Sequence, residues 1–442
     1  MIKKKKKYMV ILGITATIVT NSLLAYTAIS FGNRRLAFEK SIVTEPVDET
    51  LTPSTSSSTD NEEAQDALEK SSESQVEETE TVEEEIQDDK TKDTKETEEA
   101  AKDKDLIFLI KEGYAYELPI MGTTGYAASY LKAEPAEEGG SAFTVQSGEA
   151  FTILDEKDDK WLIAYGHNTG WIDNTYCFIN LPDVLPSAIY DCTNAYKANY
   201  VSSGIGIPNV YGETLYNAVS YNKRLGKEEF IVPVSHHTAK KICKAQQTAL
   251  KNGDTLVISE CYRPLELQQK IASNLKNLAA QNEVVQEGLT KDGWNLGWFI
   301  STGKSAHQNG YAIDVSLAKI KTQKTSEING YGYINITGYI EYDMPTAMHE
   351  LSVAAVAFEH PVDSASKIAW KNVSLAKTMT TPAEFMQAYF VNAGLIPLAS
   401  EWWHFTDLDT KAIMDKANNP GNYTLIFCLS EKPEKGSVQI TK

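Results

Sequence analysis

Apolar and polar positions alternate in short runs between residues 142 and 172, which is the pattern of half-buried β-strands. Turn-forming pairs separate the runs, among them Ser147-Gly148 and Asp158-Asp159. The spacing predicts a small closed barrel of short strands within residues 105–182. The runs are Ala142–Gln146, Ala150–Leu154, Lys160–Tyr165 and Thr169–Ile172.

The pattern changes beyond Leu181–Pro186, a stretch with two prolines that reads as a domain junction. Ile242, Ala245 and Ala249 recur at helical spacing, which predicts a helix from Thr238 to Asn252. Because helices and strands do not alternate regularly, residues 183–432 are predicted to adopt an α+β fold around a small antiparallel sheet. The other expected elements are strands at 255–263 and 311–316 and helices starting at Pro264 and covering 351–358 and 382–393.

The N-terminus combines five lysines with a largely apolar run from Tyr8 to Phe31, which two arginines follow. Such a run is long enough to cross a bilayer, and its flanking charges favour export of the rest of the chain. We expect residues 1–35 to be a membrane anchor or, as the alternative, a cleaved signal peptide. The protein is therefore predicted at the extracellular face of the cell membrane, or secreted after cleavage.

Residues 36–104 have a different composition from the rest of the chain. Between Glu45 and Lys104, 22 acidic residues stand against 6 lysines, a net charge of −16 out of −18 for the whole chain. A segment this charged has too little apolar area to fold, so it is predicted to be a disordered tether. An acidic chain also argues against nucleic acid as a partner.

Five cysteines are scattered through the sequence without any CxxC pair. Outside the cell they could form one or two disulfides, and the odd number leaves at least one free thiol. We favour the other interpretation, in which they are buried small apolar residues.

Two motifs near the C-terminus suggest chemistry. The first, from Ser305 to Asp314, contains His307 and Asp314, and the second is Glu401-Trp-Trp-His404. Two histidines and an aspartate suit a tetrahedral zinc ion with one open position, and a glutamate beside them could act as a base. Residues three apart share a face only in a helical turn or a bent segment. Each pair alone could equally be a salt bridge or a buried histidine, but both pairs in one domain favour a metal site.

With Tyr262-Arg263-Pro264 upstream, the pattern Ser-x-His-x-x-Gly-x-Ala-x-Asp and the later Glu-x-Trp-His resemble the zinc D,D-peptidases of the VanX and VanY type. The resemblance covers about residues 186–410, and residues 105–182 resemble the bacterial SH3-like domains of cell-wall proteins. It implies one zinc ion per chain, which His307, Asp314 and His404 would hold. The resemblance to the D,D-peptidases also implies that Glu401 is the catalytic base and that Arg263 stabilises the oxyanion of the tetrahedral intermediate. Ser305 and Trp402 would bind the substrate.

The resemblance also separates two branches of this family. Dipeptidases carry an aspartate near the free amino group of D-Ala-D-Ala, and His349 stands at the comparable position here. His307-Gln308 is similar to the His-Gln of the carboxypeptidases, and export points the same way. We therefore expect a zinc D,D-carboxypeptidase acting on peptidoglycan stem peptides, with a D-Ala-D-Ala dipeptidase as the alternative. A non-catalytic wall-binding protein is the rival from another class.

Overall fold

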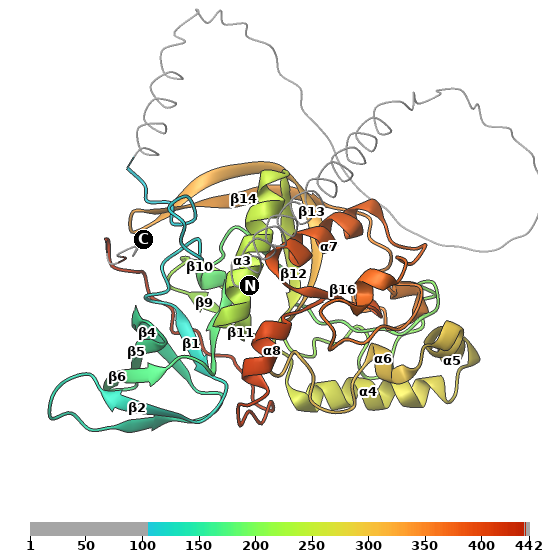
Figure 1. Ribbon diagram of the computed structural model, residues 1–442, viewed down its shortest axis with the longest axis horizontal. Helices are drawn as coiled ribbons and strands as arrows, with labels where there is room; N and C mark the ends of the chain where they lie inside the picture. Colours follow the sequence, from blue (N-terminus) through green and yellow to red (C-terminus); the bar gives the residue numbers. More distant parts are fainter. Residues whose placement is uncertain (1–104, 437, 439–442) are drawn as a thin grey trace, which may run out of the picture. The chain divides into compact units, whose positions relative to one another are not determined.

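The computed structural model describes residues 105–436 and 438 of the chain (Figure 1). The predicted membrane anchor and acidic tether lie outside these residues and remain predictions. Within the described part, no helix combines the length and apolarity needed to cross a membrane.

An eight-stranded antiparallel sheet forms a half-barrel in the order β11-β7-β1-β4-β5-β6-β2-β3. The strands from β3 to β6 coincide closely with the four predicted runs, but the sheet is open between β11 and β3, so the predicted closed barrel is wrong. Its strands are β1 (Thr124–Ala127), β2 (Leu131–Pro135), β3 (Phe143–Val145), β4 (Ala150–Lys157), β5 (Lys160–Tyr165), β6 (Asn168–Asp173), β7 (Cys177–Asn180) and β11 (Pro233–Ser235).

Alternation along these strands buries one face of the half-barrel. Phe151 and Ile153 on β4 and Trp161 and Ile163 on β5 are fully buried, whereas the position between each pair is only half-buried. The last strand, β11, comes from beyond residue 183 and pairs with β7, with Pro233 opposite Asn180. Strand β11 therefore belongs to the half-barrel although its residues lie within 183–432, the range expected to form the second domain.

The second sheet is mixed and has the order β15-β16-β13-β12-β8, with β14 paired to β13. Because β8 runs parallel to β12, the expectation of a purely antiparallel sheet is wrong. The antiparallel strands β13 and β14 form the long ribbon in Figure 1. The strands are β8 (Ile189–Tyr190), β12 (Asp254–Glu260), β13 (Ala312–Ile328), β14 (Tyr331–Glu341), β15 (Ile396–Leu398) and β16 (Glu401–Thr406), and β9 (Val219–Asn222) and β10 (Lys227–Phe230) form a separate hairpin.

Helices α3 and α7 contact each other and the mixed sheet, so they bury its central strands. The predicted helix at 238–252 is confirmed, but α3 already begins at His236. Thr238 therefore lies inside the helix, where its hydroxyl donates to Asp407 at 3.3 Å. The prediction at 382–393 corresponds to α7. The helices are α3 (His236–Lys251), α4 (Leu265–Ala279), α5 (Glu283–Thr290), α6 (Leu296–Phe299), α7 (Thr381–Ala393) and α8 (Leu408–Met414), with 3₁₀ turns at Leu181–Asp183, Lys291–Gly293, Val353–Ala355 and Ala369–Asn372.

The helix predicted at 351–358 is wrong. Only Val353–Ala355 forms a short 3₁₀ turn, which begins where the Ser352 hydroxyl accepts from the Ala354 amide. The amide of Ala357 donates instead to the carbonyl of Ala399 at 2.9 Å, and Phe358 forms a bridge with Leu375. Tertiary backbone bonds have replaced the helical ones here.

All five cysteines are free thiols, and four of them are buried. This agrees with the interpretation that they serve as small apolar residues.

Candidate metal centre

Three adjacent strands of the mixed sheet align a row of functional side chains. Glu260 on β12 lies opposite Asp314 on β13, and Asp314 lies opposite His404 on β16. Residues directly opposite each other in antiparallel strands point to the same face of the sheet. The three side chains therefore lie together although they are far apart in the sequence.

A turn before β13 adds His307 to this row. Gly310 adopts φ +67° there, and a Cβ atom at this position would lie 2.4 Å from a ring carbon of Phe178, so both conformation and space require glycine. The Gly310 amide donates to the carbonyl of His307 at 3.2 Å, which closes the turn. His307 Nε2 consequently lies 3.5 Å from Asp314 Oδ2.

The outer hydrogen bonds of the two histidines leave one nitrogen of each facing the same point. His307 Nδ1 donates to the carbonyl of Cys261 at 2.7 Å, which leaves the lone pair on Nε2. His404 Nε2 lies 3.0 Å from the Thr406 hydroxyl and can donate to it, which leaves the lone pair on Nδ1. His404 Nδ1 is 2.9 Å from Asp314 Oδ1 and 3.3 Å from His307 Nε2. Such outer partners are typical of histidines that bind metals.

His307, Asp314 and His404 thus form a buried group whose ligand atoms all lie within 4.8 Å of one another. Burial lowers the pKa of His404 despite the neighbouring Asp314, so its imidazole is neutral near pH 7. Burial alone would raise the pKa of Asp314, but His307, His349 and His404 together hold it well below its usual range. Two imidazoles and one carboxylate fit a zinc ion that keeps a fourth position for water or substrate.

Glu401 approaches the same point from the start of β16. The pairing of β15 with β16 shifts between Pro397 and Leu398, and this irregularity provides the bent segment expected for Glu401-x-x-His404. Glu401 Oε2 lies 3.7 Å from His404 Nδ1. Burial and the nearby Asp314 raise the pKa of Glu401 well above its usual range, so this carboxylate is well suited to take up a proton.

Arg263 follows β12 and is held by several groups at once. Its Nε donates to Glu260 Oε2 at 2.9 Å and its Nη1 to Gln268 Oε1 at 2.5 Å, while Nη2 lies 3.4 Å from Asp314 Oδ2. Burial would lower its pKa, but Glu260, Tyr196 and Asp314 raise it, so the guanidinium stays charged.

A second group of possible ligands, Glu260, Asp314 and His349, shares Asp314 with the first. The guanidinium of Arg263 contacts both carboxylates of this group. A positive charge is therefore already present there, and we do not assign a second metal ion to it.

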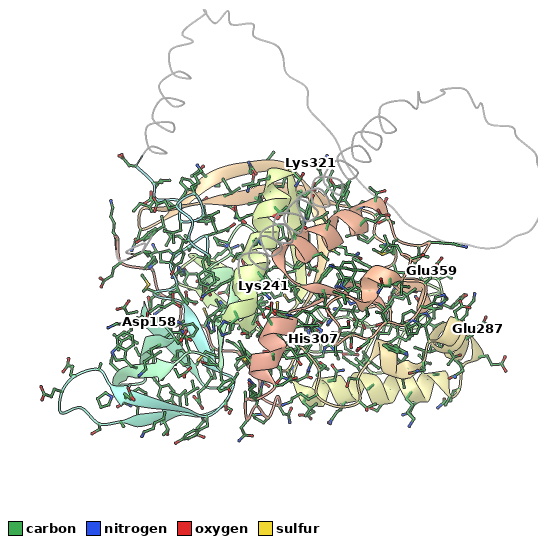
Figure 2. All side chains as sticks on the ribbon, viewed as in Figure 1. Asp158, Lys241, Glu287, His307, Lys321 and Glu359 are labelled. Carbon is green, nitrogen blue, oxygen red and sulfur yellow. The ribbon has the colours of Figure 1, made fainter. Side chains whose placement is uncertain are left out.

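A cavity of about 380 Å³ opens over the first group. His307, labelled in Figure 2, shares its wall with Leu408 and Lys411 of α8. Among the described residues that line this cavity, Glu401 is the only carboxylate. Cations and polar groups line the remainder together with apolar side chains, and the charged or polar ones include Arg263, Lys304, Ser305, Tyr311 and Lys411.

Most of the residues predicted from the sequence meet at this cavity, which is lined by His307, His404, Glu401, Arg263 and Ser305. Asp314 does not line it but completes the ligand group with the two histidines. The hydroxyl of Ser305 donates to Gln308 Oε1 at 2.9 Å.

Two other predicted residues do not line the cavity. Trp402 is buried, and its indole donates to the Thr346 hydroxyl at 2.9 Å. His349 instead has its Nε2 atom 3.2 Å from Asp314 Oδ2.

Sequence reasoning missed Glu260 and Tyr196, which surround Arg263. The Tyr196 hydroxyl donates to Glu260, and the Arg263 guanidinium lies 4.9 Å above the Tyr196 ring. An acidic residue three positions before Arg263, at the end of a strand, was the available signal for Glu260. Tyr196 comes from a loop without any motif.

Residues 232–333 match the model of the family described as VanY: D-alanyl-D-alanine carboxypeptidase. No curated protein sequence matches the chain. Among solved structures, "VanYB in complex with D-Alanine-D-Alanine" is 13% identical, with 49% of this chain and 88% of that chain covered and a TM-score of 0.22. The LD-carboxypeptidase LdcB, whose structure is described as revealing "the molecular basis of peptidoglycan recognition", is 15% identical, with coverages of 60% and 89% and a TM-score of 0.22. The family match is confined to residues 232–333, and neither solved structure contributes to the argument.

Proposed function

Because the chain contains a D,D-carboxypeptidase domain of the VanY family with a buried His/Asp/His candidate metal site, we propose that it is a zinc-dependent D,D-carboxypeptidase. Its substrate would be the peptidoglycan stem peptide, from which it removes the terminal D-alanine. One zinc ion would be held by His307, Asp314 and His404.

When bound there, zinc would polarise a water molecule and the scissile carbonyl group. Glu401 is placed to accept the proton of the attacking water and to pass it to the leaving amine, because its carboxylate lies 3.7 Å from His404 and its pKa is raised. Arg263 would stabilise the negative charge that develops on the carbonyl oxygen, since its guanidinium is fixed at the cavity wall. Ser305, which lines the cavity, is proposed to contact the substrate, and the buried Trp402 is proposed to act indirectly through its hydrogen bond to Thr346.

One observation favours a carboxypeptidase over a dipeptidase. Glu401 is the only carboxylate among the described cavity-lining residues, and it is needed as the base. A free dipeptide would bring its ammonium group into this cavity without a partner, at a cost of about 1–3 kcal/mol. A stem peptide has an amide at that point and avoids the cost.

The test compares two substrates on the full chain loaded with zinc. The ratio of kcat/KM for a stem pentapeptide ending in D-Ala-D-Ala to that for free D-Ala-D-Ala should be at least about tenfold. A Glu401→Gln variant serves as the background control. Faster cleavage of the dipeptide would establish the dipeptidase alternative, and no cleavage of either substrate by zinc-loaded protein would favour the wall-binding rival.

We also propose a place at the cell surface, with residues 1–35 as anchor and 36–104 as tether. The support is the lysine-flanked apolar run and the acidic composition, both from the sequence. Membrane fractionation of the full chain and of a chain lacking residues 1–35 tests it, because only the full chain should sediment with membranes.

A further inference from the structure

We propose that His349 is a positioning residue that fixes the orientation of the Asp314 carboxylate toward the metal. The two oxygens of Asp314 have different surroundings. Oδ1 faces His404 Nδ1 at 2.9 Å, on the side of the ligand group. Oδ2 lies 3.2 Å from His349 Nε2, 3.4 Å from Arg263 Nη2 and 3.5 Å from His307 Nε2. Because an ionised carboxylate only accepts hydrogen bonds, His349 Nε2 carries the proton and donates to Oδ2.

The His349 ring is held firmly in this position. It stacks on Tyr196 with 4.1 Å between ring centroids and an interplanar angle of 9°, and it meets the Trp403 ring edge-on at 5.9 Å. Only 2% of the residue is exposed. Tyr196 is itself fixed, since its hydroxyl donates to Glu260. One aromatic ring therefore supports both His349 and the Arg263–Glu260 pair.

The backbone at His349 is in a conformation that residues with a side chain rarely adopt. Its φ angle is +59°, in the left-handed region. The surrounding chain imposes it: the Lys197 amide donates to the His349 carbonyl at 3.3 Å, and the Leu351 amide donates to the Lys197 carbonyl at 3.0 Å. The buried Glu350 accepts from the amide and hydroxyl of Ser202 at 3.1 and 2.6 Å. Such over-determined strain is concentrated at functional sites.

These contacts together hold the Asp314 carboxylate in one orientation, with Oδ1 beside His404 Nδ1 and Oδ2 held most closely by His349 Nε2. Without His349, Oδ2 would lose its shortest contact and keep the longer ones to Arg263 Nη2 at 3.4 Å and His307 Nε2 at 3.5 Å. The carboxylate would then be free to rotate out of the ligand geometry. Loss of an outer hydrogen bond to a metal ligand typically weakens metal affinity by about 10–100-fold. A residue that served packing alone would not need a donor at Nε2.

The inference rests on the proposed zinc site and is tested by zinc affinity rather than by activity. We expect His349→Phe, which keeps a ring against Tyr196 but removes the donor, to bind zinc about 10–100-fold more weakly in competition with a chelator. His349→Gln should restore most of the affinity, because its amide nitrogen reaches about as far from Cβ as Nε2 does. The matched control is His236→Phe, since His236 is also buried and packs against an aromatic ring, that of Trp161 at 5.0 Å.

A second variant covers the case in which His349→Phe does not fold. Asparagine tolerates the left-handed backbone but its amide is too short to reach Asp314, so His349→Asn should also lose affinity. The visible absorption of cobalt-substituted protein should change in the weak variants and not in His349→Gln. Zinc affinity of a folded His349→Phe or His349→Asn variant within about twofold of the unmodified protein would overturn the inference, whereas an unmodified protein that binds no zinc would overturn the proposed function instead.

Discussion

Asp314 and His404 are direct cross-strand partners on β13 and β16, and their Oδ1 and Nδ1 atoms lie 2.9 Å apart. Strand pairing alone therefore joins two candidate ligands that are 90 positions apart in the sequence. A slip of one residue in this register would turn one of them to the other face of the sheet. The site depends on the register of the mixed sheet as much as on the identity of its residues.

Replacing any one of the candidate ligands should remove the metal. His307→Ala, Asp314→Ala and His404→Ala are each expected to reduce bound zinc from about one equivalent to near none, since a site with three protein ligands cannot spare one. Elemental analysis of the purified proteins measures this, with His236→Ala as a control that should keep its zinc. Full zinc content in all three variants would exclude the site.

Glu401→Gln should separate metal binding from turnover. The amide keeps the size of the side chain but cannot accept a proton, so zinc content should persist while kcat falls by at least about 10²–10⁴-fold. Stem-peptide turnover and elemental analysis of the same preparation check both parts. A rate near that of the unmodified protein would assign the base to another residue.

Arg263→Lys should impair turnover nearly as much as Arg263→Ala. The guanidinium uses separate nitrogens for Glu260 and Gln268 and holds a third position near Asp314, which one ammonium group cannot reproduce. Comparing kcat for the two variants tests this, with circular dichroism as the control for folding. Normal turnover in the lysine variant would show that positive charge alone suffices.

Glu117 should make stability depend on pH away from the active site. Burial raises its pKa from 4.5 to about 7, although Ser187 and Gln247 donate to it. The folded state then binds more protons than the unfolded state between these values. The free energy of unfolding should therefore fall as pH rises from about 4.5 to 7, by up to about 3 kcal/mol, and level off above.

Urea denaturation of the unmodified protein and of Glu117→Gln at several pH values isolates this contribution. The free energy of unfolding of the unmodified protein, relative to that of Glu117→Gln, should decrease as pH rises from about 4.5 to 7. A difference that stays constant from pH 4.5 to 8 would rule out the raised pKa.

Local patterns in the sequence were sufficient for elements whose own residues determine them. The stripe of α3 and the alternation of β4 to β6 predicted those elements, and the run 311–316 predicted the start of β13. The segment 351–358 failed because its amides are used by a distant carbonyl at Ala399, which no local pattern reveals. The parallel pairing of β8 with β12 and the extra strand β11 are long-range for the same reason.

The candidate site shows the same division. Motifs led to the residues that would touch metal or substrate, because chemistry restricts their types and spacing. The residues that support them, Tyr196 and Glu260, depend on tertiary packing around Arg263 and left no motif. His349 was expected to face substrate by analogy, and the structure places its ring behind Asp314, where only the fold shows what it contacts.

The most direct test of the account is titration of metal-free protein with zinc in the presence of a stem pentapeptide. We predict that free D-alanine and the tetrapeptide appear in equal amounts, with a rate that rises linearly to a plateau at one zinc per chain, and that Asp314→Ala shows no such rise. Cleavage that proceeds at full rate in the metal-free protein, or none at one equivalent of bound zinc, would contradict it.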